Sequence, residues 1–448
     1  MERLVSEAAA SPIGVAFGHG GSSDPRARTT LCLVVVEEDR VTAGFAELSA
    51  VDADPGKAWK ELRPWNAHLP EANVARARAW AARKKPDRAR WKLDKPQPVD
   101  GEGLLAKILE QPADDQLRLV YADWLTEQGD PRGELIAFQI RRAQEEQGGK
   151  QALDLRQREL HLWQSEPIAR LFKGWLGFEW APLLLDDGVT VARGQGQHGA
   201  EALWFRRGFV EAITMQATKL SQLNGLMAQE PVETLTIYTS GPPDGARIAA
   251  LPGLSRVRKL SLMPLRAIQP DGLSLLLESR ELRKLRSLEL VGQSMLEVGA
   301  LLLAARGPEV LPSLEQLTVV DDALTATALS ALRSTRWFRR LKSLKLEAVA
   351  LRPAAISALA EGPEVEWESL SLERDGLGVS DVVPLFRAKA LAGLKRLSLA
   401  KNNLGNVAGL LATPLLSSLQ QLSLNGNPLT ESARQVLRAR LNEKVLLD

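Results

Sequence analysis

LRSLEL, at residues 285–290, decides the fold, because close copies of it recur along the second half of the chain. Each copy follows the pattern L-x-x-L-x-L or an apolar variant of it. The copies are VEAITM (210–215), VETLTI (232–237), VRKLSL (257–262), LRSLEL (285–290), LEQLTV (314–319), LKSLKL (341–346), WESLSL (367–372), LKRLSL (394–399) and LQQLSL (419–424). Fourth positions of successive copies lie 22 to 29 residues apart, a period typical of repeat architectures.

The six-residue motif has the length and alternation of a short β-strand that points its leucines to one side. Helical patterns such as MLEVGALLLAARG (295–307) and ATALSALRST (326–335) fill the return segments. A single unit cannot bury its leucines, whereas stacked units share a continuous core. A bundle of Leu-rich helices would not produce strand-like motifs at this spacing. The fold class that we predict is therefore an α/β solenoid.

The repeats resemble the leucine-rich repeat family, and their lengths and helical returns are similar to its ribonuclease-inhibitor subclass. The resemblance covers residues 206–448 and implies about nine repeats, stacked as a horseshoe with a parallel sheet on the concave side. Asn402 and Asn427 hold the ninth position of their repeats, where a side-chain amide can satisfy backbone groups of the turn that leaves the strand. Asp322 and Asp375 hold the same position in earlier repeats.

Residues 103–205, just before the repeats, have helical patterning. Within DQLRLVYADWLTEQGDPRGELIAFQI (115–140), apolar residues recur at helical steps from Leu117 to Leu125, and a second helix is predicted from about Glu134. We expect a helical adaptor that caps the open end of the first repeat. Large apolar side chains suited to that end are Trp124, Trp163, Trp175 and Trp180. A docking module in its own right is the alternative.

The segment ADWLTEQGDPRGELIAFQ (122–139) closely resembles the bacterial repeat-companion domain, a small module that occurs beside leucine-rich repeats. RRGFVEAI (206–213) is similar to the sequence that often opens such arrays. The resemblance implies an association with repeats and a bacterial source. It implies no activity.

Residues 1–95 predict a small α/β or α+β domain that resembles no family. PIGVAF (12–17) reads as a strand and residues 29–49 read as a hairpin, with helical patterns near 56–63 and 72–85. An enzyme in this domain, with the repeats as a targeting arm, is one alternative function.

A basic segment at 76–95 interleaves Lys and Arg with Trp80 and Trp91, which is the composition of a nucleic-acid surface. The competing interpretation is a solvated helix that runs into a linker. Nucleic-acid association is therefore a second alternative function. Its candidate contacts are Arg76, Arg78, Lys84, Lys85, Arg88 and Arg90.

Composition narrows the function classes. A formal net charge of +2 over 448 residues gives no overall attraction to nucleic acid or acidic membranes. The single cysteine, Cys32, excludes an internal disulfide and fits a reducing compartment. No catalytic, P-loop or metal-ligand motif is present, so we expect no enzyme activity, cofactor or metal. The apolar runs are too short to span a bilayer and the N-terminus lacks the pattern of a signal peptide, so a cytoplasmic protein is expected.

The strand positions beside the inward leucines would face the hollow of the horseshoe. At the fifth position, seven of nine repeats carry Ser or Thr. The seventh position carries an apolar or aromatic residue in four consecutive repeats and then two carboxylates: Tyr238, Met263, Val291, Val320, Glu347 and Glu373. A contiguous exposed apolar patch marks a contact site. We hypothesise a protein-docking patch with an acidic rim, and hence an interaction scaffold. Internal packing of the N-terminal segment on the patch is the competing interpretation.

Overall fold

The computed structural model describes most of the second half of the chain and part of the first. The described residues are 14–18, 30–37, 40–47, 63–64, 100–145, 149–165, 168, 180–185, 189–194, 201–407, 410 and 413–447. The chain divides into two compact units, Met1–Pro98 and Val99–Asp448, which we describe separately.

The first unit contains a four-stranded antiparallel sheet. Its strands, in sheet order, are β1 (Gly14–Gly18), β2 (Thr30–Glu37), β3 (Arg40–Glu47) and β4 (Arg63–Pro64). β1 to β3 fall in the segments whose patterns predict strands, and Cys32 lies in β2. The helices expected near 56–63 and 72–85 lie outside the described residues, apart from Arg63 in β4.

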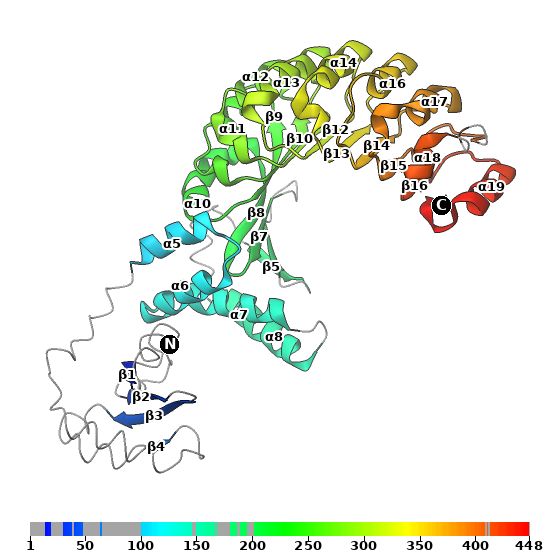
Figure 1. Cartoon of the computed structure of the whole chain (residues 1–448). Coiled ribbons are helices and arrows are strands. Elements are labelled where there is room, and N and C mark those ends of the chain that lie inside the picture. The colour runs from blue at the N-terminus through cyan, green and yellow to red at the C-terminus, as the bar shows by residue number, and fades with distance from the viewer. Residues whose placement is uncertain are drawn as a thin grey trace. The chain divides into compact units, whose positions relative to one another are not determined.

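The second unit is a mixed α/β structure built on a sheet of 13 strands (Figure 1). Ten of these strands run parallel, and each pairs with the next along the chain. They are β8 (Phe209–Gln216), β9 (Thr234–Ser240), β10 (Lys259–Arg266), β11 (Ser287–Val291), β12 (Gln316–Val320), β13 (Ser343–Glu347), β14 (Ser369–Glu373), β15 (Arg396–Ser398), β16 (Gln421–Ser423) and β17 (Val445–Leu446).

Helices return the chain from one strand to the next along the outer side of the arc, and the strands line its inner side (Figure 1). The α-helices are α10 (Leu223–Gln229), α11 (Asp244–Ala249), α12 (Gln269–Leu276), α13 (Leu296–Val310), α14 (Ala326–Ser334), α15 (Arg336–Arg339), α16 (Pro353–Ala360), α17 (Val379–Arg387), α18 (Pro414–Ser418) and α19 (Glu431–Leu441). The 3-10 helices are η2 (Ala217–Gln222), η3 (Leu254–Arg256), η4 (Arg280–Lys284), η5 (Lys389–Leu391) and η7 (Asn442–Lys444). We call the sheet side the concave face and the helix side the convex face.

A ladder of aliphatic side chains holds the repeats together. Each of the nine sequence copies overlaps one of the strands β8 to β16, and the register places their fourth positions side by side. The ladder runs through Ile213, Leu235, Leu260, Leu288, Leu317, Leu344, Leu370, Leu397 and Leu422. None of these side chains is more than 3% exposed. Full burial of each stabilises the fold by about 1.5–3 kcal/mol. The mixed α/β structure with its 13-stranded sheet is consistent with the repeat architecture that the motif spacing predicts.

The turn that leaves each strand has the same backbone conformation from β11 onward. Its residue has a φ between 52° and 69° in six successive repeats. These residues are Gly292, Asp321, Ala348, Arg374, Lys401 and Gly426. Four of the six are neither Gly nor Asn, although the left-handed region is unfavourable for such residues. The stacking of the repeats therefore imposes a left-handed backbone conformation on residues that do not favour it intrinsically.

Side chains at the next position bind that turn, as the sequence predicts for Asn402 and Asn427. Asn402 Nδ2 donates to the carbonyls of Leu372 (2.8 Å) and Leu399 (3.0 Å), and its Oδ1 accepts from Asp375 N at 3.0 Å. Asn427 Nδ2 donates to Leu399 O at 2.8 Å. Each amide thus ties a strand end to the preceding repeat.

The same position holds other residue types in earlier repeats. Asp322 accepts from the backbone N–H groups of Met295 and Leu296, and Asp375 accepts from that of Val349 at 2.7 Å. Gln293, which the sequence analysis did not single out, donates to Leu262 O and accepts from Ile268 N. Its signal was its ninth position in LRSLELVGQ.

Asp375 fits this position less well than asparagine would. Burial raises the pKa of its carboxyl to about 6, although backbone N–H groups, that of Val349 first, act in the opposite direction. Its Oδ2 is buried and accepts no hydrogen bond from the described residues. The folded state therefore binds the proton more tightly than the unfolded state, and this group's contribution to stability falls as pH rises from about 4 to 6.

We predict that Asp375→Asn stabilises the fold by roughly 1 kcal/mol at pH 7, because an amide can donate where the carboxylate cannot. The variant should also lose the part of the stability change between pH 4 and 6 that Asp375 causes. Thermal unfolding followed by circular dichroism at several pH values measures both effects. An unchanged pH profile together with a lower melting temperature would contradict this account.

Three antiparallel strands, rather than helices, extend the sheet before the first repeat. They are β5 (Trp180–Leu184), β6 (Val189–Gly194) and β7 (Ala202–Arg206), in the order β5-β6-β7-β8. The prediction that residues 103–205 form a helical cap is therefore wrong over these three strands, and Trp180 begins the first of them. Hairpin pairing satisfies the edge of the parallel sheet directly, which a helix cannot do. Trp175 lies outside the described residues.

Among the described residues, four helices precede these strands (Figure 1), and their side chains share two cores with the first repeat. The helices are α5 (Gly101–Glu110), α6 (Asp115–Glu127), α7 (Arg132–Gln144) and α8 (Lys150–Gln164). Leu135 and Trp163 belong to the core of the repeats, whereas Phe209 of β8 belongs to the core of the helices, where Trp124 packs. This exchange makes the helices a fixed extension of the repeat array.

Two arginines enclose Phe209 at this junction. The guanidinium carbons of Arg118 and Arg132 lie 4.9 and 4.5 Å from the centre of its ring. Arg118 also donates to Glu211 at 2.8 Å and to the carbonyl of Arg206. Cation–π contacts of this kind strengthen when water is excluded, and Arg118 is fully buried.

Arg132 also forms a buried ion pair with Glu230. Its Nη2 lies 2.7 Å from both carboxylate oxygens, and Val210 N donates to the same carboxylate at 2.8 Å. Burial nevertheless raises the pKa of Glu230, because the fully buried charge is costly even beside Arg132. The turn Arg207–Gly208 requires glycine, since Gly208 has φ +76° and a Cβ there would clash with Ile136.

Replacing one partner of this ion pair should lower the free energy of unfolding more than replacing both. We predict that Arg132→Met destabilises the second unit by about 3–5 kcal/mol, because it leaves the Glu230 carboxylate buried without a cation. The double variant Arg132→Met/Glu230→Met should lose less. Urea unfolding of the full chain measures the difference. If Arg132→Met is at least as stable as the double variant, the ion pair does not stabilise the junction.

Candidate functional site

The six predicted contact residues form one row across the concave face. Backbone pairing places Tyr238 beside Met263, Val291 beside Val320, and Glu347 between Val320 and Glu373. Because β10 pairs with β11, the row is continuous over six strands. All six side chains are partly exposed. Among the described residues, the helices that connect these strands lie on the opposite side of the sheet (Figure 1), so the row faces outward.

The apolar part of this row consists of Tyr238, Met263, Val291 and Val320, and we call it the concave apolar row. Adjacent strands lie about 4.8 Å apart, so the four side chains span about 14 Å. They project from a hydrogen-bonded sheet and not from loops. A partner would therefore meet a preformed surface and lose little free energy in ordering it.

A second row, at the fifth position, carries short polar side chains and interrupts them with Glu289 and Lys345. Ser261 Oγ donates to Glu289 Oε2 at 2.7 Å, across the β10–β11 pair. The small side chains leave the concave apolar row sterically open.

The acidic rim divides into two different carboxylates. Lys345 Nζ and Arg374 Nε lie 2.7 and 2.9 Å from the Glu347 carboxylate. Burial disfavours the charged form of Glu347, but the hydrogen bond from Lys345 and the nearby cations outweigh it and lower the pKa of that carboxyl. The charge of Glu347 is thus compensated within the face, which the sequence analysis did not foresee.

Glu373 is held differently. Its Oε1 accepts hydrogen bonds from Ser371 Oγ at 2.8 Å and Ser398 Oγ at 2.7 Å. Neutral hydroxyl donors orient the carboxylate and leave its charge in place. Of the two predicted rim residues, Glu373 is therefore the better acceptor for a partner's cation.

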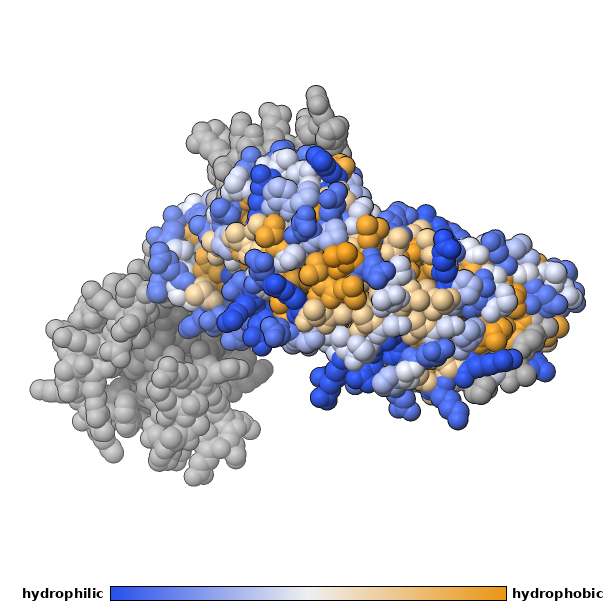
Figure 2. All heavy atoms as spheres, turned by 90° about the horizontal axis from the view of Figure 1, so that it is seen from above, coloured by the Kyte–Doolittle hydropathy of each residue, from blue (hydrophilic) through white to orange (hydrophobic). Residues whose placement is uncertain are grey.

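A second exposed apolar surface lies on the convex face, and the sequence analysis missed it. It consists of Leu275 on α12 with Val298, Leu301, Leu302 and Ala305 on α13, and we call it the convex apolar patch. Figure 2 shows apolar side chains gathered in the middle of this face. The signal in the sequence was VGALLLAA (298–305), which is apolar on all sides, a composition that predicts a helix covered on all sides.

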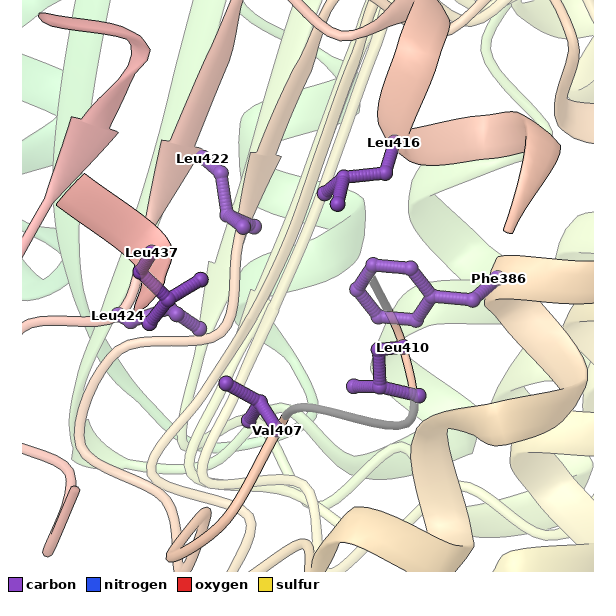
Figure 3. Close-up of a pocket in the computed structure, with 7 residues that line it drawn as sticks. All are labelled: Phe386, Val407, Leu410, Leu416, Leu422, Leu424 and Leu437. Atoms are coloured by element: carbon purple, nitrogen blue, oxygen red, sulfur yellow. The ribbon is translucent and has the colours of Figure 1, made fainter. Parts of the chain in front are cut away.

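A small gap between the last repeats is lined by apolar side chains. Figure 3 shows its lining residues, which point toward one another from the returns and strands of these repeats. All seven are apolar: Phe386, Val407, Leu410, Leu416, Leu422, Leu424 and Leu437. With no polar group to orient a ligand, the gap is packing space.

Neither a metal-ligand cluster nor a membrane-spanning helix occurs in the part of the chain that the structure describes. Among the described residues, no three His, Cys, Asp or Glu side chains cluster as metal ligands would. No helix in the described ranges is long and apolar enough to cross a bilayer. The candidate nucleic-acid contacts at 76–95 lie outside the described residues.

Comparisons with known proteins give limited information. No family model matches the chain, and no curated protein matches its sequence. Among solved structures, the chain is similar to one titled "Crystal structure of Rad7 and Elc1 complex in yeast", at 17% sequence identity and a TM-score of 0.36. The alignment covers 52% of this chain and 58% of that one, which is less than two thirds of its length. Similarity at this level carries no argument about function.

Proposed function

We propose that this protein is a non-enzymatic scaffold of the leucine-rich repeat type that binds another protein on its concave face. The observation that carries the proposal is the concave apolar row, which is partly exposed and continuous over four neighbouring strands. Solvated sheet faces normally carry polar residues at such positions. A contiguous apolar row on a rigid sheet therefore favours a protein contact.

The geometry indicates how affinity would arise. A few buried anchors dominate most protein interfaces, and aromatic residues are prominent among them. Tyr238 and Met263, side by side on β9 and β10, have the size and adaptability for this role. Glu373 would add a polar contact at the other end of the row and favour a partner with a cation there.

The N-terminal helices have a supporting role in this proposal. Their resemblance to the bacterial repeat-companion domain and their interlocked cores both favour an extension that fixes the first repeat. We propose a cytoplasmic protein that needs no cofactor. Nucleic-acid binding through 76–95 and an activity in the first unit stay as predictions from the sequence.

The test compares variants of the full chain as bait in affinity purification from the native cell. We predict that Met263→Glu reduces recovery of the specific partner at least tenfold, because it places a charge at the centre of an apolar contact. The matched control is Val120→Glu, an exposed apolar residue on α6, which should recover the partner as the parent chain does. If Met263→Glu recovers the same partner in full, the concave apolar row is not the binding site.

A further inference from the structure

The convex apolar patch exposes large aliphatic side chains to water, which is unfavourable. Val298 is 56% exposed and Leu301 is 39% exposed, whereas Ala300 and Leu303 on the inner side of α13 are buried in the repeat core. The neighbouring helix α14 turns Thr327, Ser330 and other small uncharged side chains outward. A bulky partner surface can therefore approach α13 closely without meeting an exposed charge from α14.

We propose that this patch is the interface of a homodimer, in which α13 packs antiparallel to α13 of a second copy. The proposal is independent of the concave site. Such an interface uses the same surface twice, so the surface must be complementary to itself. α13 satisfies this requirement in shape and in charge.

The complementarity follows from the order of residues along α13. A two-fold axis that crosses the helix between Leu301 and Leu302 places each residue opposite the one equally far beyond the axis. Leu301 then faces Leu302 of the second copy, and the large Val298 faces the small Ala305. Large side chains opposite small ones fill an interface without voids.

The same axis brings opposite charges together. Glu297 faces Arg306 of the second copy, and the pair occurs twice. Glu297 accepts one hydrogen bond, from Thr325 Oγ1 at 3.0 Å, and its other oxygen is left for a cation. Arg306 is exposed and forms no ion pair with the described residues. Parallel pairing would lack this match, since Arg306 would then meet Arg306.

A dimer of this form leaves both concave faces accessible, because the dimer contact is on the helix side of the sheet (Figures 1 and 2). Each dimer could therefore engage two partner molecules, or one partner with two binding segments at higher avidity.

Sedimentation equilibrium of the full chain between 1 and 100 μM tests for the dimer, and circular dichroism verifies that each variant is folded. We expect a dimer whose dissociation constant rises at least tenfold in Leu301→Glu. The matched control is Leu153→Glu on α8, where the parent side chain is 52% exposed. It should leave the dimer unchanged. A monomer at 100 μM, or a dimer that Leu301→Glu does not weaken, overturns the proposal.

A charge-swap experiment tests the antiparallel pairing itself. Glu297→Arg alone and Arg306→Glu alone each place like charges opposite one another, so each variant should dimerise at least fivefold more weakly. An equimolar mixture of the two variants restores both opposite-charge pairs in a heterodimer. Recovery of the parent affinity in the mixture supports the proposal. A mixture as weak as the separate variants contradicts it.

Discussion

The structure depends on the inability of any single repeat to bury its own leucines. Each strand places aliphatic side chains on one side, and the strands and helices of the neighbouring repeats help to cover them. The backbone turns follow from this stacking, since residues such as Ala348 and Arg374 adopt a left-handed conformation that their neighbours impose. Side chains from Gln293 to Asn427 then bind the turns from one repeat to the next. These contacts between successive repeats hold the strands of the concave face in register.

The same constraint explains the N-terminal junction. A stack of repeats exposes its first ladder residue, Ile213, unless something covers it. Here β7, β6 and β5 continue the sheet, and Arg118 of α6 and Arg132 of α7 enclose Phe209. The motif in residues 115–140 thus has a structural role, which is to hold the start of the first repeat. Arg118, Arg132 and Gln139 are all buried and all bind the turn that precedes β8 or the residues beside it.

The sequence predicted those features that recur at the same position in each repeat. The leucine ladder, the amides at Asn402 and Asn427, and the row from Tyr238 to Glu373 follow from counting positions, because register repeats with the motif. Features that depend on contacts between unrelated segments were missed. Arg374 of the next repeat pairs with Glu347, whose other cation partner is Lys345 on the same strand, and β5 to β7 have no repeat pattern to mark them as strands. The convex apolar patch had a signal in the composition of α13, but exposure is a tertiary property.

The central claim is that the concave apolar row contacts a protein partner. Photo-crosslinking in the native cell tests it most directly, with a benzophenone amino acid placed at 263 or at 320 in the full chain and at 153 as the control. The account predicts that positions 263 and 320 crosslink to one and the same protein, which position 153 does not capture. Crosslinks from position 153 alone, or none from 263 and 320, would contradict it.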